Sequence, residues 1–426
     1  MRKGHFVIEP TFQCNVCCDH CIHKSSWERR ERMPLELFRS CINQALKQGW
    51  TTICVSGGEP FLLPDYIRAA AELCFEQGVA LVIQTNGFWG QNPVKARKML
   101  QNMTGITQIG FSVDKVHLKE IGLEPVLHAI KATIEAGIYN VSASIAYQTN
   151  LEFQILKEQF TSRFPGFVVE GWPILPIGRA KNHPELRVDC LTYPWEQLKR
   201  NCDAQIQLRP VVHPNGSLHF CYQAVMALEE KDPLQLGNLN EYMLAELLGN
   251  VQNRLLMFMI AYGGGGLGYL LHKSPYEGLL HEKYQTVCHF CHEILSRPKV
   301  VAYLQELLAE EAFELRIMEG INRAYEGWKE DLDTARERIL ICNGPSCGRN
   351  HQNRPILYYL LNKLFESNKA HLAKVEFVNC LNSCGTGPNL YLERQNKLVQ
   401  RVDLETIDYI VKEIGHRRCF DNSSSL

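Results

Sequence analysis

The feature that most constrains the fold of this chain is an alternation of β-type and helical segments along residues 5–180. Six short runs rich in β-branched and aromatic residues are expected to be strands, at 5–11, 52–56, 80–85, 106–113, 140–147 and 167–173. Between them, apolar residues recur every three to four positions, which predicts helices at 34–49, 65–77, 93–103, 125–137 and 151–163. Repeated β-then-α units predict a parallel sheet with right-handed crossovers. Six units are too few for a closed eight-stranded barrel, so the fold class expected is α/β, a partial (β/α)6 barrel of the TIM type. In such sheets the functional residues lie at the carboxyl ends of the strands.

The length of 426 residues exceeds that of one compact core and predicts two to four domains. The alternation stops near residue 180, where short segments with scattered cysteines begin. A final unit is expected to contain strands at 338–342, 375–379 and 390–392 and helices at 354–366 and 404–415. The domains expected are the partial barrel at 1–182, a small cysteine-rich domain at 183–300, a helical connector at 301–335, an α/β unit at 336–418 and a tail at 419–426.

Composition excludes some classes of partner and location. Lys plus Arg (45) nearly balance Asp plus Glu (46), which gives no sign of nucleic-acid or anionic-membrane binding. The N-terminal residues lack the features of a signal peptide, and no apolar run reaches the roughly 18 residues that a membrane span needs. A cytoplasmic protein is therefore expected, with reduced thiols. Under reducing conditions, 17 cysteines favour metal ligation over disulfides.

Four cysteines lie together in F-Q-C-N-V-C-C-D-H-C-I-H, residues 12–23. They can be divided into two Cys-x2-Cys pairs, which could bind zinc, or into Cys14-x3-Cys18-x2-Cys21 with Cys17 left over. Structural zinc pairs are normally separated by a longer loop. Three thiolates from one loop suit three irons of a cubane cluster, and they leave the fourth iron open to bind and activate a ligand.

A second motif, V-S-G-G-E-P at 55–60, follows the second expected strand. Its glycines allow the backbone to approach a ligand closely, and Glu59 offers an acceptor to a cationic amine. With Cys-x3-Cys-x2-Cys after the first strand and Gly-Gly-Glu-Pro after the second, residues 5–180 resemble the radical S-adenosylmethionine (SAM) superfamily.

The resemblance implies that Cys14, Cys18 and Cys21 hold a [4Fe–4S] cluster whose open iron chelates the amine and carboxylate of SAM. An electron from the cluster would then split the C–S bond of SAM, and the 5′-deoxyadenosyl radical would take hydrogen from a substrate. The cofactor-binding residues it implies are Gly57, Gly58, Glu59, Pro60, His20, Asn86, Ser112 and Arg179. The catalytic candidates are Asp114, Ser112 and Cys17.

Several of these residues also have an ordinary structural interpretation. His20 stands before the third cysteine, where the superfamily usually has an aromatic residue against adenine, so histidine is a departure. Ser112 and Asp114, at the end of the fourth strand, could reach ribose, carboxylate or substrate, or could be loop residues. Arg179, in P-I-L-P-I-G-R-A at 173–180, is expected near SAM, the alternative being an exposed side chain in a turn at Gly178.

The middle of the chain contains a second pattern of cysteines. Cys202 is followed by Gly216 and Cys221, and C-H-F-C supplies Cys288 and Cys291. This spacing resembles the SPASM domain and its shorter relative, the twitch domain, and implies one auxiliary [4Fe–4S] cluster on those four cysteines. Structural zinc is the alternative, and Cys190 could replace one ligand. The segment H-P-N-G-S-L-H-F-C at 213–221 predicts a β-hairpin with Asn-Gly at its turn.

The last unit contains two further pairs, Cys342-x4-Cys347 and Cys380-x3-Cys384, each after an expected strand. Residues 336–416 resemble the thioredoxin-like [2Fe–2S] ferredoxins, which take one thiolate pair from each of two loops. The resemblance implies a [2Fe–2S] cluster on these four cysteines, although tetrahedral thiolate sites can also bind zinc.

A ferredoxin domain fused to a radical SAM domain suggests a fixed electron route. Its direction stays open, and an external electron donor is expected. The substrate favoured is a ribosomally synthesised precursor peptide, which would make the protein a peptide maturase. Because the chain begins close to its first strand, a separate leader-binding partner is expected. The alternatives are a radical SAM dehydrogenase or rearranging enzyme acting on a small molecule, and a non-enzymatic iron–sulfur relay or sensor, against which the intact 57–60 motif argues.

Overall fold

The chain divides into two compact units, Met1–Lys329 and Glu330–Leu426. The computed structural model describes residues 5–138, 140–164, 167–186, 192–195, 198, 209–221, 232–249, 255, 266–272, 274–310, 337–342, 356, 359–360, 363–364, 367, 373–378, 388–393, 395 and 397–414.

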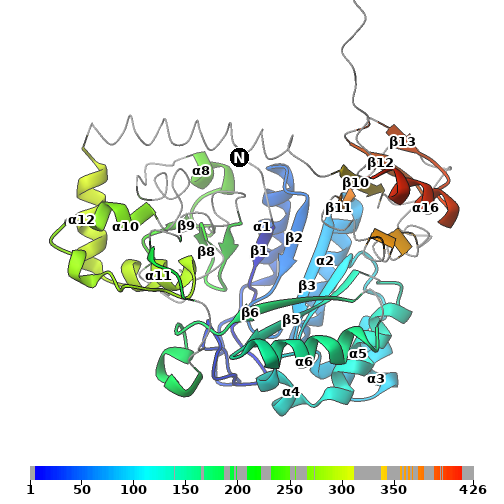
Figure 1. Cartoon of the computed structure of the whole chain (residues 1–426), viewed down its shortest axis with the longest axis horizontal. Coiled ribbons are helices and arrows are strands. Elements are labelled where there is room, and N and C mark those ends of the chain that lie inside the picture. The colour runs from blue at the N-terminus through cyan, green and yellow to red at the C-terminus, as the bar shows by residue number, and fades with distance from the viewer. Residues whose placement is uncertain are drawn as a thin grey trace, which may run out of the picture. The chain divides into compact units, whose positions relative to one another are not determined.

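The first unit is built on a nine-stranded sheet in the order β6-β5-β4-β3-β2-β1-β7-β8-β9 (Figure 1). The six strands of the expected barrel are β1 (Phe6–Ile8), β2 (Thr52–Val55), β3 (Ala80–Thr85), β4 (Gln108–Ser112), β5 (Asn140–Tyr147) and β6 (Val168–Pro173). All neighbouring pairs among them are parallel. The helices between them are α1 (Leu35–Lys47), α2 (Pro64–Glu76), α3 (Pro93–Leu100), α4 (Lys115–Ile121), α5 (Leu123–Glu135) and α6 (Asn150–Thr161). Six parallel strands in sequential order confirm the predicted partial barrel.

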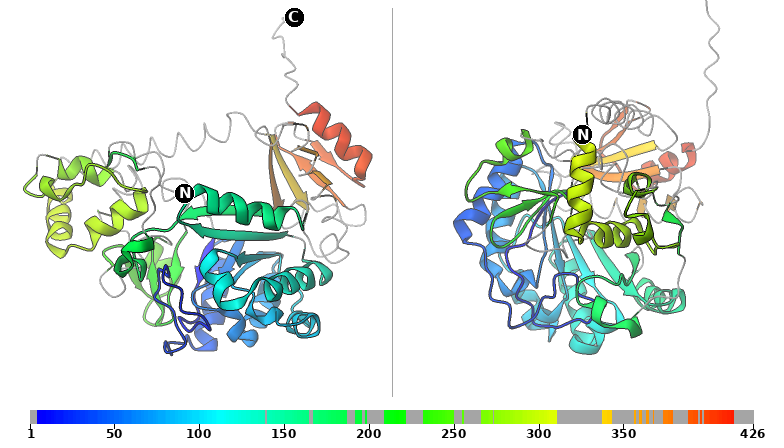
Figure 2. Two further views of the ribbon diagram at one scale, coloured as in Figure 1. Left: turned by 60° about the horizontal axis from the view of Figure 1, so that its bottom comes forward. Right: turned by 90° about the vertical axis from the view of Figure 1, so that its left-hand side faces the viewer.

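The sheet is curved, with its helices on the outer side (Figure 2). Successive strand residues point to opposite faces, so each strand contributes to two layers. Phe6 and Ile8 of β1 belong to the large core shared with the helices, and the Phe6 and Trp50 rings lie 5.2 Å apart. Val7 packs instead in a small separate cluster with Cys54, Val82 and Val211. Each large apolar side chain buried under the helices contributes about 1.5–3 kcal/mol to folding.

Helix α4 is an element that the sequence pattern did not predict. It has seven residues and is separated from β4 by only two residues. Asp114 is its N-cap, and its Oδ1 accepts hydrogen bonds from the backbone N–H groups of Val116 and His117, both at 3.1 Å. The cap turns the chain at the carboxyl end of β4 and so fixes the position of the His117 side chain.

Three further strands extend the barrel sheet beyond β1. They are β7 (Val211–Val212), β8 (Ser217–His219) and β9 (Gln235–Asn238). Strand β7 pairs in parallel with β1, and β8 pairs antiparallel with β7 and with β9. The predicted hairpin is confirmed: Gly216 has φ +84°, and Asn215 Oδ1 accepts a hydrogen bond from Ser217 N at 3.0 Å. That the hairpin continues the barrel sheet was not foreseen.

The remaining helices of the first unit are α8 (Leu244–Gly249), α10 (Gly266–Leu271), α11 (Val287–Leu295) and α12 (Pro298–Leu308). Helix α12 overlaps the start of the predicted connector, and residues 311–335 of that connector lie outside the described residues. Within the described ranges, no helix has both the length and the apolar character that a membrane crossing requires.

The second unit has a four-stranded sheet in the order β11-β10-β12-β13. Its elements are β10 (Glu337–Cys342), β11 (Ala373–Val378), β12 (Leu390–Leu392), β13 (Lys397–Val399) and α16 (Leu404–Glu413). Strand β10 is parallel to β11 and antiparallel to β12, which is antiparallel to β13. The predicted strands and the last helix are present, and β13 is additional. The helix predicted at 354–366 lies largely outside the described residues.

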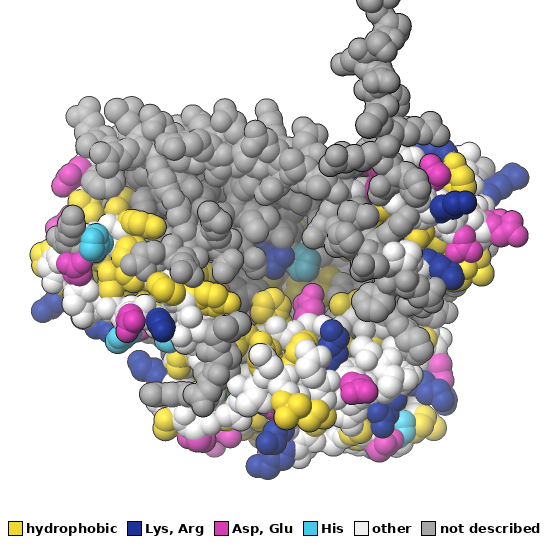
Figure 3. Space-filling model, viewed as in Figure 1, with side chains coloured by type: hydrophobic (Ala, Val, Ile, Leu, Met, Phe, Trp, Pro, Cys, Tyr) yellow, Lys and Arg dark blue, Asp and Glu magenta, His cyan; other side chains and the backbone are white. Residues whose placement is uncertain are grey.

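Charged side chains are mixed on the surface. On the face seen in Figure 3, basic and acidic side chains of the described residues alternate over the barrel helices and do not gather by sign. This agrees with the formal net charge of −1.

Candidate functional site

Three of the four early cysteines gather in the loop between β1 and α1. Cys14 and Cys18 are buried with Val16 in one small cluster, and Cys21 packs against it. Cys17 is exposed. Of the two divisions that the sequence left open, the geometry favours Cys14-x3-Cys18-x2-Cys21. The catalytic candidate Cys17 is not part of this buried cluster.

Each of the three thiols faces one nitrogen atom. Asn86 Nδ2 lies 3.8 Å from Cys14 Sγ, His117 Nε2 lies 3.4 Å from Cys18 Sγ, and the backbone N–H of Ser25 donates to Cys21 Sγ at 3.3 Å. Such contacts to sulfur stabilise thiolate ligands of iron–sulfur clusters. Burial raises the pKa of the Cys14 thiol, so this group needs a metal's positive charge to ionise. The set of three thiols fits an iron–sulfur cluster.

The two glycines of the Gly-Gly-Glu-Pro segment lie against the cysteine loop. Gly58 N donates to Thr11 O at 2.8 Å, and Glu59 N donates to Gln13 O at 2.9 Å. A Cβ at Gly58 would lie 2.0 Å from Gln13 O, and Gly57 has φ +107°. The close backbone approach expected toward a ligand is thus an approach to the loop that carries the cysteines.

The Glu59 carboxylate is buried and fully engaged within the protein. It accepts hydrogen bonds from Phe61 N at 3.0 Å, Thr85 Oγ1 at 2.8 Å and Asn86 N at 2.8 Å. Burial raises the pKa of Glu59 to about 7. These contacts tie η1 (Pro60–Leu62) to the end of β3. Contact of Glu59 and Pro60 with the SAM amine stays a prediction.

Asn86 links β3 to the cysteine loop. Its Nδ2 donates to Asn15 Oδ1 at 2.9 Å, and its Oδ1 accepts from Phe88 N at 3.0 Å. Ser112 is the last residue of β4 and is half-buried. Asn86 and Ser112 both lie at the carboxyl ends of strands, as predicted. Of the two, only Asn86 contacts a cysteine thiol among the described residues.

Arg179, beyond β6, clamps the cysteine loop from the other side. Its guanidinium donates through Nη1 to Cys18 O and through Nη2 to Ser25 O, the latter at 2.8 Å, and its backbone N donates to Cys21 O at 3.0 Å. Gly178 has φ +59°, as the predicted turn requires. The alternative of an exposed arginine is therefore wrong, while the expected proximity to SAM stays a prediction.

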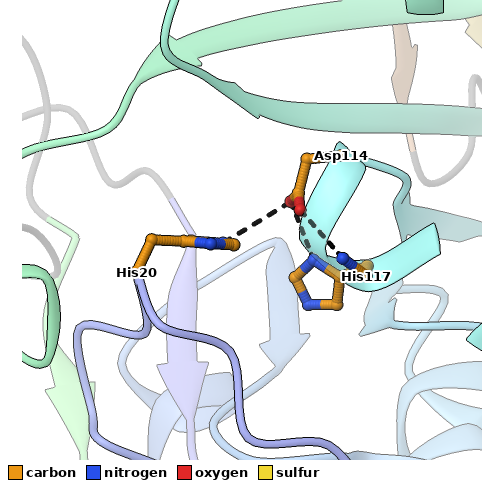
Figure 4. Close-up of side chains that lie close together, drawn as sticks. All are labelled: His20, Asp114 and His117. Atoms are coloured by element: carbon orange, nitrogen blue, oxygen red, sulfur yellow. Dashed lines mark hydrogen bonds and ion pairs between the residues drawn. The ribbon is translucent and has the colours of Figure 1, made fainter. Parts of the chain in front are cut away.

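His20, Asp114 and His117 form a compact polar cluster next to Cys18 (Figure 4). Asp114 Oδ2 lies 2.7 Å from His117 Nδ1 and 3.5 Å from His20 Nε2. Burial opposes ionisation of both partners, but their mutual attraction lowers the pKa of Asp114 and raises that of His117. One atom from each residue lies within 4.8 Å of the others, close enough to hold a cation. Sequence reasoning missed His117, although the spacing Asp-x2-His at a helix start could have suggested it.

A second polar cluster joins β1, the cysteine loop and the β7–β8 hairpin. Buried Glu9 lies 3.0 Å from His23 Nε2 and 3.5 Å from His213 Nε2. His213 stacks on His219, whose Nδ1 lies 2.6 Å from Asp232 Oδ2. Burial alone would raise the pKa of Glu9, but the nearby His23 and His213 lower it below its ordinary value. Apart from the histidines of the hairpin, no sequence pattern indicates this cluster.

The later cysteines are only partly described. Cys221 lies two residues after the end of β8, and Cys288 and Cys291 lie three residues apart on one face of α11. Cys342 is buried at the end of β10. The other cysteines predicted as ligands lie outside the described residues: Cys202, Cys347, Cys380 and Cys384, with the substitute Cys190.

Comparison with known proteins assigns the first part of the chain. Residues 8–151 match the family model described as Radical SAM superfamily. YydG of Bacillus subtilis (strain 168), whose name assigns it to peptide biosynthesis, is 23% identical over 174 residues, 40% of this chain and 54% of YydG. GTP 3′,8-cyclase of Helicobacter pylori (strain ATCC 700392 / 26695) is 29% identical over 132 residues, 30% of this chain and 40% of the cyclase. The chain thus matches about half or less of the length of these relatives.

A solved structure of anSMEcpe with bound AdoMet aligns with 72% of this chain and 99% of anSMEcpe, at 14% sequence identity and a TM-score of 0.45. The family match runs from the end of β1 through β5 and includes the loop of three gathered thiols. A domain of this family implies SAM and a [4Fe–4S] cluster as cofactors. Residues 8–151 therefore form a domain of the radical SAM superfamily.

Proposed function

We propose that the protein cleaves SAM reductively and uses the resulting radical to abstract hydrogen from a substrate. Cys14, Cys18 and Cys21 are the proposed ligands of the [4Fe–4S] cluster. The observation that carries the proposal is the grouping of these three thiols, each facing a nitrogen atom, while Cys17 is exposed. Three protein ligands leave one iron for SAM.

When bound, the cluster and SAM would supply an electron and a carbon–sulfur bond whose homolysis yields methionine and the 5′-deoxyadenosyl radical. The chain's own contribution is to hold the ligands and to exclude water. Asn86, Ser25 N and His117 contact the three sulfurs. Arg179 and the backbone of Gly58 fix the loop from two sides, so the thiols are held in place before a substrate arrives.

We further propose an auxiliary [4Fe–4S] cluster on Cys202, Cys221, Cys288 and Cys291. In its support, Cys288 and Cys291 share one face of α11, and Cys221 ends a hairpin that continues the barrel sheet. Metal analysis distinguishes this cluster from the zinc alternative. Two [4Fe–4S] clusters in the first unit would contain eight irons, whereas a zinc site in place of the auxiliary cluster would leave four irons and one zinc.

For the second unit we propose a thioredoxin-like domain with a [2Fe–2S] cluster on Cys342, Cys347, Cys380 and Cys384. One parallel and two antiparallel pairs, with β10 central, agree with that fold. Cys342 stands at the carboxyl end of β10, where a ligand-bearing loop is expected. With all three clusters assembled, about ten irons per chain are expected.

The proposed substrate is a precursor peptide, which would make the protein a peptide maturase. The similarity to YydG, a protein named for peptide biosynthesis, supports it. The match to GTP 3′,8-cyclase keeps a small-molecule substrate as the second candidate. Mass spectrometry of candidate precursor peptides, coexpressed with the protein or with its Cys18→Ala variant, distinguishes them. A mass change that depends on Cys18 supports the peptide, and unchanged peptides beside active SAM cleavage support the small molecule.

A further inference from the structure

The His117 ring stands between two groups that accept hydrogen bonds. Its Nδ1 lies 2.7 Å from Asp114 Oδ2, and its Nε2 lies 3.4 Å from Cys18 Sγ. The side chain is only 15% exposed and that of Asp114 only 3%. Because Asp114 also caps α4, the carboxylate holds both the helix and the ring in place.

The chemistry of these partners dictates the role of the ring. A carboxylate and a metal-bound thiolate can both only accept hydrogen bonds. The ring is placed to donate a hydrogen bond from Nδ1 to the carboxylate and one from Nε2 to the thiolate. A reduced cluster holds one more electron than an oxidised cluster, so a nearby donor and positive charge stabilise the reduced form.

The three thiols differ in this respect. Cys14 faces the neutral amide of Asn86 at 3.8 Å, and Cys21 faces the backbone N–H of Ser25 at 3.3 Å. Among these three partners, only His117 can carry a charge. Its electrostatic influence on the cluster would therefore exceed that of the other two contacts.

We propose that His117, oriented by Asp114, is a positioning residue that raises the reduction potential of the cluster through a hydrogen bond to Cys18. The inference rests on the proposed cluster at Cys14, Cys18 and Cys21. A cation between Asp114 and the two histidines is the competing arrangement, but it would have to replace the 2.7 Å contact between Asp114 and His117. The hydrogen-bonded arrangement also accounts for the contact between His117 Nε2 and Cys18 Sγ.

The test is an EPR-monitored redox titration of the full chain, reconstituted without oxygen. The cluster is identified as the one whose signal changes when SAM is added, which separates it from auxiliary clusters. His117→Ala is expected to lower the equilibrium constant for reduction at least tenfold, which is about 59 mV for one electron. His117→Gln keeps a neutral donor and is expected to fall between His117→Ala and wild type.

Two further variants refine the comparison. Asp114→Asn retains a good helix cap but loses the negative charge that orients the ring, so its potential is expected to shift in the same direction as in His117→Ala. His128→Gln is the matched control, because His128 Nδ1 contacts only the backbone oxygen of Gly90, at 3.1 Å, in the described interactions. Its potential is expected to equal that of wild type.

Four results would overturn the inference. A His117 variant with a full cluster and the wild-type potential would show that the contact has no electrostatic role. Failure of both His117 variants to assemble the cluster would make the residue structural. A SAM-induced signal change seen only in the variants would make His117 a ligand of the fourth iron, and a further metal ion lost with His117 would favour the cation. Absence of any SAM-sensitive signal in wild type and in all the variants would instead refute the proposed function itself.

Discussion

Replacing Gly58 by alanine tests whether the segment after β2 holds the cysteine loop in place. A Cβ at this position would lie 2.0 Å from the Gln13 oxygen and 2.8 Å from the Phe12 carbonyl carbon, both backbone atoms. Real contacts of a Cβ stay above about 3.0 Å, so the two backbones must separate by about 1 Å. No flexible side chain is available to relieve the contact.

The energetic cost follows from the hydrogen bonds that this separation breaks. Gly58 N to Thr11 O (2.8 Å) and Glu59 N to Gln13 O (2.9 Å) would both stretch beyond hydrogen-bonding distance. Each contributes about 0.5–1.5 kcal/mol net, and leaving buried groups unpaired costs more, so we expect a loss of about 2–4 kcal/mol. The loop would move with its cysteines, and both iron content and SAM affinity should fall.

Thermal unfolding, iron analysis and SAM titration of the reconstituted protein measure these effects. Gly278→Ala is the matched control, because nothing lies within 4 Å of a Cβ there, and its stability should stay within about 0.5 kcal/mol of wild type. Gly90→Ala meets the Pro125 oxygen at 1.9 Å, away from the loop, and should lose stability while its folded fraction keeps its iron. Normal iron content and SAM affinity in Gly58→Ala would refute the reasoning.

Four other variants extend the account. Cys17→Ser should retain the cluster, because this side chain is exposed, whereas Cys18→Ser should lose about four irons; equal losses in iron analysis would contradict the assignment of ligands. Arg179→Met keeps the apolar stem but loses the hydrogen bonds to the Cys18 and Ser25 oxygens. We expect about 2–4 kcal/mol less stability in denaturant unfolding, together with weaker iron retention. An unchanged denaturant midpoint would show that Arg179 does not hold the cysteine loop in place. His23→Leu leaves buried Glu9 with His213 at 3.5 Å as its remaining ion-pair partner among the described residues and should cost roughly 3 kcal/mol; a loss below about 1 kcal/mol would show that His23 does not stabilise Glu9.

The sequence predicted the local elements well because their signals are local. The six barrel strands follow from buried β-type runs, and the order of the sheet follows from the crossover rule. The Asn215-Gly216 turn could also be predicted, because its signal lies in two adjacent residues. Helix α4 was missed because seven residues are too few to show a clear periodicity.

The missed features of the site depend on contacts between distant residues. Arg179 reaches the backbone of Cys18, 161 positions away, and His117 reaches the thiol of Cys18, 99 positions away. Spacing along the chain carries no information about such pairs. The two motif glycines show a related limit: the sequence indicated a close backbone approach, but only the fold shows that the neighbour is the cysteine loop.

The central claim is that three thiols leave one iron free to bind and cleave SAM. It is tested most directly in a variant in which the eight proposed auxiliary ligands are replaced by alanine, so that Cys14, Cys18 and Cys21 are the only proposed ligands left. After reconstitution and chemical reduction, this variant should hold about four irons and convert SAM to 5′-deoxyadenosine and methionine. Four bound irons with no 5′-deoxyadenosine would contradict the claim.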